Sequence, residues 1–125
     1  MPNIILKKTF KNKPQGYSIK NEKTFSFHGG ISPEIINLVN RRVGMLRLAP
    51  GADRLYFQMD SFGHYSAKMN HDFQKHHEED AVVTILDVME EINYAFKFQY
   101  DQEVHSSQAK GASYTRREMF IFSKA

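Results

Sequence analysis

Hydrophobic residues follow a helical spacing and then a strand spacing in the second half of the chain. Ile85 and Met89 stand four residues apart within a longer apolar stripe, which predicts an amphipathic helix over 78–92. Directly afterwards, aromatic residues alternate with other residue types over 94–100, as in a strand with two unlike faces. Residues 119–122 are apolar at every position, which is typical of a buried strand. We therefore expect the helix to pack across an antiparallel strand pair.

Weaker alternation near the N-terminus predicts further strands. Residues 4–10 carry Lys7 and Lys8 near their middle, and we place them at the edge of a sheet, where lysines discourage aggregation. Residues 11–16 contain a proline and a glycine, which indicates a turn. Residues 17–27 alternate on either side of a polar centre, which predicts a short hairpin.

A helix start follows these strands. Ser32 is a suitable N-cap, and Pro33 suits the first helical position. The apolar stripe behind them predicts a helix over 33–43. Gly44 is placed to end this helix in the left-handed conformation that glycine adopts without strain.

Three more alternating stretches, 45–48, 55–60 and 65–69, predict a β-meander. Residues 70–77 are ambiguous, because they contain capping residues but are too polar to anchor a helix by packing. The connection at 101–113 is polar and unusually long for a hairpin, so we expect a mobile loop there.

These elements predict one globular domain over 1–125. We expect the α+β class, with a mainly antiparallel sheet of about six to eight strands and helices near 33–43 and 78–92. At 125 residues without cysteine, the chain must be held together by packing of one ordinary core. The residues predicted to form this core are Ile36, Val39, Leu46, Leu48, Leu55, Phe57, Ile85, Leu86, Met89, Phe96, Phe98 and Ile121.

The net charge of +3 hides a division along the chain. Residues 1–58 have a net charge of +7, residues 59–103 one of −7, and residues 104–125 one of +3. Such asymmetry bears on partners and association rather than on fold. The candidate nucleic-acid or anion-binding residues are Lys7, Lys8, Lys11, Lys13, Lys20, Lys23, Arg41, Arg42, Arg116 and Arg117.

No motif in the sequence points to catalysis, and we assign no catalytic residue, metal or cofactor. His71, His76 and His77 form the closest histidine group, but adjacent residues on a helix point about 100° apart, whereas zinc-binding pairs usually stand about three to five residues apart. This spacing favours a solvated tract. The glycines before Pro33 suit phosphate binding, but Pro33 removes a donor and Glu34 adds a negative charge, so a plain cap is favoured.

The aromatic residues of 94–100 admit two interpretations. An open strand face of this kind stacks nucleic-acid bases in some single-strand binders. Their position next to an amphipathic helix favours core packing instead, and we therefore assign Phe96 and Phe98 to the core.

Two non-enzymatic functions are favoured over a third alternative, a small-molecule enzyme, for which the sequence offers no catalytic signature. The first is a binding module whose basic surface meets a polyanion, with nucleic acid as the leading ligand. The second is a small interaction or regulatory protein that associates with itself or with an acidic protein partner, by matching its basic segments to its acidic helix. The apolar run at the N-terminus is too short for a signal peptide and no run approaches a membrane span, so we expect a cytoplasmic protein without membrane association.

Overall fold

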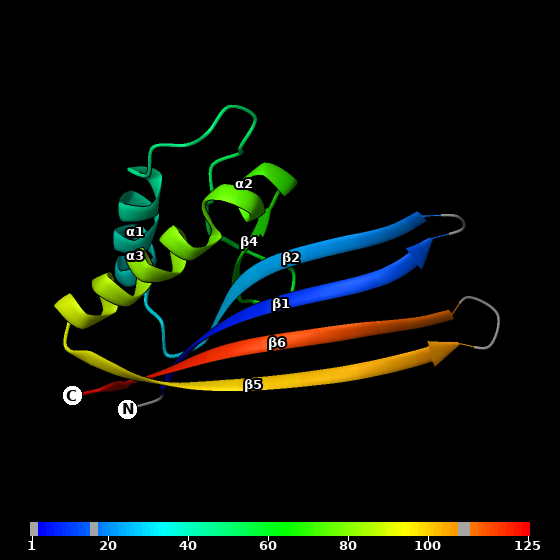
Figure 1. Cartoon of the computed structure of the whole chain (residues 1–125). Helices are drawn as coiled ribbons and strands as arrows, with labels where there is room; N and C mark the ends of the chain where they lie inside the picture. The colour runs from blue at the N-terminus through cyan, green and yellow to red at the C-terminus, as the bar shows by residue number, and fades with distance from the viewer. Residues whose placement is uncertain (1–2, 16–17, 108–110) are drawn as a thin grey trace.

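Antiparallel hairpins build the sheet of this protein, and helices lie between them along the chain (Figure 1). The computed structural model describes residues 3–15, 18–107 and 111–125, and the side chains of these residues outside 12–21 and 103–114. The described elements are β1 (Ile4–Gln15), β2 (Ser18–Gly29), α1 (Pro33–Gly44), β3 (Gln58–Met59), β4 (Tyr65–Met69), α2 (His71–His76), α3 (Glu78–Glu91), β5 (Tyr94–Ser107) and β6 (Gly111–Lys124).

The strands form one sheet in the order β3-β4-β2-β1-β6-β5, with every neighbouring pair antiparallel. The pairing of β1 with β6 joins the N-terminal and C-terminal hairpins. Figure 1 shows all the labelled helices gathered over one side of the sheet, toward one end of the long strands. We call this side the helix face, and the side that no described helix covers the open face.

The α+β prediction is confirmed, because six antiparallel strands and the two expected helices occur within the described residues. Helix α1 begins at Pro33 and α3 at Glu78, as predicted. Strand β4 also matches the predicted range of 65–69. The ambiguous stretch before α3 forms the short helix α2, which is capped by Asn70, whose side-chain oxygen accepts a hydrogen bond of 2.9 Å from the Phe73 amide.

The core lies between the helix face and the helices. Strands β1 and β2 contribute alternate residues, as expected for strands with one covered face. The largest buried contributions come from Ile4, Leu6, Phe25, Phe27, Phe57, Phe73, Ile85, Val88 and Met89. Burying one such side chain contributes roughly 1.5–3 kcal/mol, so these contacts are what fix the helices to the sheet.

Most of the predicted core residues are placed correctly. Ile36, Val39, Leu55, Phe57, Ile85 and Met89 are buried. Leu46, Leu48 and Leu86 are half-buried and pack against this cluster, and Ile121 is half-buried. Phe96 and Phe98 were assigned to the core wrongly, since they remain 49% and 52% exposed. Helix α3 contacts the beginning of β5, and the aromatic residues farther along this strand lie past the helix.

The prediction of an edge strand at 4–10 is wrong, because β1 lies between β2 and β6. The predicted turn at 11–16 is wrong over 11–15, and the predicted hairpin at 17–27 is wrong over 18–27, while residues 16 and 17 lie outside the described residues. Strands β1 and β2 are continuous and pair residue by residue from Ile4 opposite Gly29 to Gln15 opposite Ser18. In Figure 1 the far halves of these strands extend beyond the helices, so nothing there requires an apolar side chain. A polar stretch in this position therefore does not mark a turn.

The segment between α1 and β4 forms a shorter sheet than predicted. Residues 45–48 form no strand, and of 55–60 the structure assigns Gln58–Met59 to β3. At Phe57 the reason is Asn40 on α1, because its side chain forms hydrogen bonds with both backbone groups of Phe57. Asn40 Oδ1 accepts from the Phe57 amide at 2.8 Å, and Asn40 Nδ2 donates to the Phe57 carbonyl at 3.1 Å. A helix side chain thus takes the place of a neighbouring strand at Phe57.

The end of α1 also differs from the prediction. Gly44 is the last residue of the helix, and the described residues with positive φ do not include it. The C-cap residue is Met45, which has φ −85° and donates its amide to carbonyls of the last turn. The carbonyl of Gly44 accepts a hydrogen bond from the Arg54 guanidinium, so this carbonyl is satisfied without a left-handed residue.

The assignment of 101–113 to a loop is wrong. Strand β5 runs to Ser107, and β6 begins at Gly111 and pairs with β5 from this residue onward. Residues 108–110 of the predicted loop lie outside the described residues. Polar composition misled the prediction because the backbone ladder between two strands forms between polar residues as well as apolar ones. Among the described residues, no helix is long and apolar enough to span a membrane.

Candidate functional site

Alternating strand positions create a hollow on the open face. Lys7, Thr9 and Lys11 of β1 point to this face, because the residues between them take the helix face. The hollow has a volume of about 360 Å³. Its cations are Lys7, Lys11, Lys68 and Arg117, and its hydroxyl groups come from Thr9, Thr24, Ser26 and Ser66. Residues from both terminal hairpins and from β4 therefore meet in one place.

Three of the four cations in the hollow, Lys7, Lys11 and Lys68, have no carboxylate within ion-pair distance among the described residues. Arg117 pairs with Asp101 on the neighbouring strand, with 3.2 Å between Nη1 and Oδ2. Asp60 also lines the hollow, so its four cations are opposed there by one carboxylate. The lining thus carries an excess of positive charge, from which an anionic ligand gains.

The rings of two histidines contact each other in the hollow. The ring centroids of His28 and His64 are 4.0 Å apart, and His28 Nε2 lies 2.8 Å from the Ser26 hydroxyl oxygen. Burial lowers the pKa of His28, electrostatic interactions with Lys7 and His64 lower it further, and the charge of Asp60 partly offsets this by raising it. His28 is therefore neutral near pH 7, and a negative charge arriving in the hollow favours its protonation.

The turn before β4 presents an aromatic ring beside these histidines. Asp60 Oδ1 accepts hydrogen bonds from the amides of Phe62 at 2.9 Å and His64 at 3.0 Å. Gly63 has φ +82°, a value that suits glycine. The backbone bond from His64 is the main cause of the lowered pKa of Asp60, which therefore stays charged and keeps its two acceptor bonds. The turn leaves Phe62 82% exposed at the hollow.

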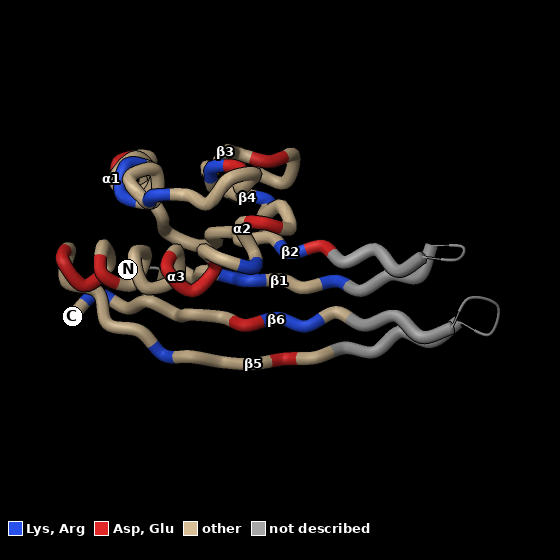
Figure 2. Tube along the Cα trace, turned by 45° about the horizontal axis from the view of Figure 1, so that its top comes forward, with Lys and Arg blue, Asp and Glu red and all other residues tan. Residues whose placement is uncertain are grey.

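The ten candidate cations predicted from the sequence lie on different surfaces. Figure 2 shows the basic segments of β1 and β6 side by side in the sheet, and acidic positions along α3. Lys7, Lys11 and Arg117 share the hollow, whereas Lys8, Lys23 and Arg116 lie on the helix face. Arg41 is exposed on α1, and Arg42 beside it forms hydrogen bonds of 2.8 and 2.9 Å to Glu91. The side chains of Lys13 and Lys20 lie outside those described.

The helix-face cations are engaged within the chain. Lys8 Nζ lies 2.6 Å from Glu118 and 3.6 Å from Glu78, and Lys23 Nζ lies 3.1 Å from Glu78. Lys23 and Arg116 also stand over the ring of Phe10, at 5.6 and 5.1 Å from its centroid. Glu78 begins α3, so these pairs tie the acidic helix to the centre of the sheet and leave less of this charge for a ligand.

Several residues of the hollow were not among the predicted candidates, namely Lys68, His28, His64 and Phe62. A signal for part of this group exists, because His64, Ser66 and Lys68 alternate with apolar residues and so share the polar face of β4. The sequence does not reveal that β4 pairs with β2, which brings this polar face beside Lys7.

One residue of the histidine group His71, His76 and His77 has a structural role. His77 is buried, and its Nε2 accepts a hydrogen bond of 2.8 Å from the Ala49 amide, which anchors the loop after α1. This bond engages one of the two ring nitrogens through which a histidine can bind a metal. No group of three or more histidine and acidic side chains within the described residues is arranged to hold a metal ion.

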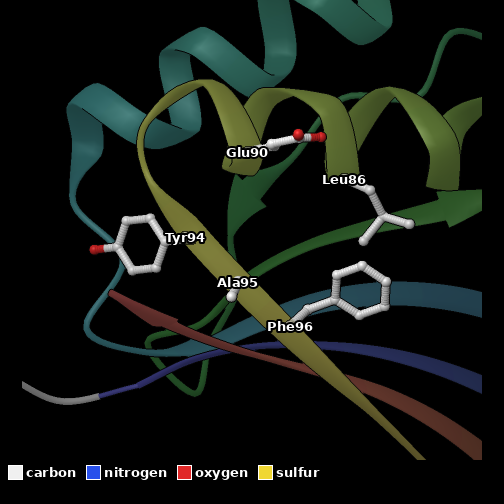
Figure 3. A pocket seen from close by; sticks show the side chains of 5 residues that line it. All are labelled: Leu86, Glu90, Tyr94, Ala95 and Phe96. Carbon is white, nitrogen blue, oxygen red and sulfur yellow. The ribbon is translucent and has the colours of Figure 1, made fainter. Parts of the chain in front are cut away.

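A second surface lies at the edge of the sheet formed by β5. Leu86 and Glu90 of α3 and Tyr94, Ala95 and Phe96 of β5 line a pocket of about 370 Å³. Figure 3 shows the side chains of Leu86 and Phe96 facing each other across it. Beyond this pocket the aromatic row continues with Phe98 and Tyr100, which are 52% and 53% exposed.

Comparisons with known proteins support the fold alone. No protein-family model matches the chain, and no curated protein matches its sequence. Its structure is similar to that of a conserved kinetoplastid-specific protein from Trypanosoma cruzi, with a TM-score of 0.50, 14% sequence identity and 100% of each chain covered. At this identity the likeness concerns the arrangement of helices and strands and does not extend to the residues of the hollow.

Proposed function

We propose that this protein is a non-enzymatic binding module that holds single-stranded nucleic acid on its open face. The observation that carries the proposal is a set of three lysines around one hollow, Lys7, Lys11 and Lys68, for which the described part of the chain offers no counterion. Lysine, arginine, serine and threonine supply most protein contacts to phosphate oxygens, and the hollow is lined by these residue types. A phosphate backbone crossing β1 gains from every one of these cations.

The aromatic side chains of the hollow favour a single strand over a duplex. Proteins that bind single strands combine a basic groove with aromatic rings on which bases stack, at roughly 1–3 kcal/mol per base. Phe62 is 82% exposed, and the rings of His28 and His64, which contact each other at a tilt of 49°, line the same hollow. These rings can stack bases only where the bases are unpaired. An acidic protein segment satisfies the lysines equally well but has no bases to stack on Phe62.

Titration of labelled oligonucleotides by fluorescence anisotropy at several salt concentrations tests this proposal. Replacing Lys7, Lys11 and Lys68 together with Gln removes up to three phosphate contacts. The slope of log affinity against log salt is about 0.7 per contact for single strands, so we expect it to become shallower by about 2. Binding should weaken for all sequences alike, because phosphate contacts carry no sequence information.

A matched control keeps the same change in net charge. Arg41, Arg47 and Lys75 are exposed and lie outside the hollow, so replacing all three with Gln should leave the slope nearly unchanged. In addition, Phe62→Ala should lower the affinity without changing the slope, because it removes stacking and no charge. Equal losses in both triple variants would attribute binding to net charge alone. No binding by the unmodified protein at low salt would end the proposal.

A further inference from the structure

We infer that the outer edge of β5 is the interface of a two-fold homodimer, in which β5 pairs antiparallel with β5 of a second copy. This inference concerns a different surface from the nucleic-acid proposal and does not depend on it. Strand β5 is the last strand of the sheet, paired with β6 on one side, and no described segment pairs with its other side. Long open edges of this kind are templates for strand addition.

The free backbone groups of this edge belong to the even-numbered residues. The carbonyl of Asn93 accepts a bond of 2.8 Å from the amide of Ala125, so this pair is hydrogen-bonded. Pairing of β5 with β6 continues without a bulge from Tyr94 opposite Lys124, and hydrogen-bonded pairs alternate with non-hydrogen-bonded ones. The backbone amides and carbonyls of Phe96, Phe98 and Tyr100 therefore point away from β6. In the monomer these groups bind water, and in an assembly they need a partner strand.

The side chains of the same residues form an exposed apolar row along the edge. Phe96, Phe98 and Tyr100 are 49%, 52% and 53% exposed, although they lie on the helix face. Phe96 and Phe98 touch Phe120 of β6 on their inner side, with ring centroids 5.9 and 5.2 Å apart. Their outer side is open. A second β5 placed alongside covers this outer side and satisfies the free backbone groups at once.

Charge and aromatic pairing together favour one register, with a second copy of the chain as the partner. Because only even-numbered residues offer free backbone groups, an even residue must stand opposite an even one. With Gln99 opposite Gln99 of the second copy, Lys97 stands opposite Asp101 twice, and Phe98 stands opposite Tyr100 twice. Opposite charges and aromatic pairs across strands each contribute favourably. Lys97 and Asp101 lie on the open face and meet as non-hydrogen-bonded pairs, in which side chains approach more closely.

The neighbouring registers do not combine the charge match with the aromatic match. With Phe98 opposite itself, Lys97 faces Gln99. With Tyr100 opposite itself, Lys97 faces Glu103, but Phe98 then faces Gln102 and loses its aromatic partner. Shifts that place Lys97 opposite Lys97, or Asp101 opposite Asp101, oppose like charges, which is destabilising. A lysine in an edge strand usually prevents pairing with foreign strands. In β5, Asp101 follows Lys97 by four residues. Lys97 can therefore pair with Asp101 of a second β5 when Gln99 stands opposite Gln99.

Reversal of these charges tests the interface by sedimentation equilibrium. We expect the unmodified protein to form dimers, and Lys97→Asp and Asp101→Lys each to weaken the dimer by about tenfold or more, because two attractive pairs become two repulsive ones. An equimolar mixture of the two variants should dimerise again, since each variant then faces the opposite charge. Lys75→Asp, an equal charge change on exposed α2, is the control and should leave the dimer unchanged.

Hydrogen exchange gives an independent test. In the dimer the amides of Phe96, Phe98 and Tyr100 should be protected, whereas in either monomeric variant they should exchange faster than their odd-numbered neighbours, which remain bonded to β6. A monomeric unmodified protein would overturn the inference, as would a dimer that both charge reversals leave intact. A mixture of the variants that associates no better than each variant alone would overturn the proposed register.

Discussion

Asn40 shows how one polar residue replaces a strand neighbour. It is half-buried on α1, and its amide group bonds both the N–H and the C=O of Phe57, a core residue. We predict that Asn40→Ala lowers the free energy of unfolding by about 1–3 kcal/mol, because two backbone groups lose their partners. Urea unfolding measures this change. Asn37→Ala, at an exposed position of the same helix, should change stability far less. Equal effects would show that helix propensity and not this contact matters.

His28 reports the charge of the hollow. Its pKa is lowered by burial, by Lys7 and by His64, so the fold favours the neutral ring. The unfolded chain therefore takes up this proton first as the pH falls, and the stability that His28 contributes is present above its ordinary pKa of about 6.5 and lost below it, as the pH falls through the folded pKa.

NMR titration of the His28 ring tests this account. The folded pKa should lie below that of a free histidine, and Lys7→Gln should raise it, because one nearby cation is removed. Lys75→Gln serves as the control and should leave the His28 pKa unchanged. An oligonucleotide bound in the hollow should also raise this pKa, and its affinity should correspondingly increase as the pH falls below neutrality. A His28 pKa that does not respond to Lys7→Gln would refute the proximity of the two charges.

At the scale of elements, helix α1 depends on the cap that the sequence predicts. The Ser32 hydroxyl oxygen accepts a bond of 3.3 Å from the Ile35 amide, and Pro33 occupies the first turn. Ser32→Ala should lower stability by about 1 kcal/mol, whereas Ser32→Asp should retain most of it, because both Ser and Asp are good caps. Ser61→Ala, at an exposed turn position, is the reference. Thermal or urea unfolding that gives equal values for Ser32→Ala and Ser61→Ala would contradict the capping role.

The two long hairpins show a different balance of forces along their length. Near the helices, alternate residues such as Leu6 and Phe27 are fully buried, and packing holds the strands. Farther out, pairs such as Asp101 with Arg117 face each other across a backbone ladder without a helix over them. Composition over these outer parts resembles that of a loop, while the pairing is that of a strand.

At the scale of the whole molecule, the charge division along the chain is partly neutralised within it. Lys8 and Lys23 meet Glu78, and Arg42 meets Glu91, so part of the basic first segment pairs with the acidic α3 of the same chain. Lys7, Lys11 and Lys68, which have no such pair among the described residues, gather on the open face. The two proposals thus use separate surfaces, with nucleic acid on the open face and a second copy at the β5 edge.

The proposed dimer would place both open faces on the same side of one continuous sheet, because a two-fold axis perpendicular to a sheet exchanges its halves without turning either over. Lys97→Asp weakens the dimer and leaves every cation of the hollow in place, whereas Asp101→Lys also removes the ion-pair partner of Arg117, which lines the hollow. With Lys97→Asp, oligonucleotide binding and self-association can therefore succeed or fail independently.

The sequence by itself determined the elements whose signals are local. The periodicity of α3, the cap of α1 and the alternation of β4 each involve residues within a few positions of one another, and all three predictions are confirmed. The α+β class follows from the same signals. Lys7, Lys11 and Arg117 were identified as candidate cations from charge alone, since residue type is a property of the sequence.

Tertiary structure decided what depends on contacts between distant segments. Pairing of β1 with β6 and of β2 with β4 made an expected edge strand central and brought Lys68 and His64 beside Lys7. Alternation within β5 shows that Phe96 and Phe98 share a face, but whether that face is covered depends on where α3 ends over the sheet. Burial and counterions depend on neighbours far along the chain, and local pattern carries no information about them.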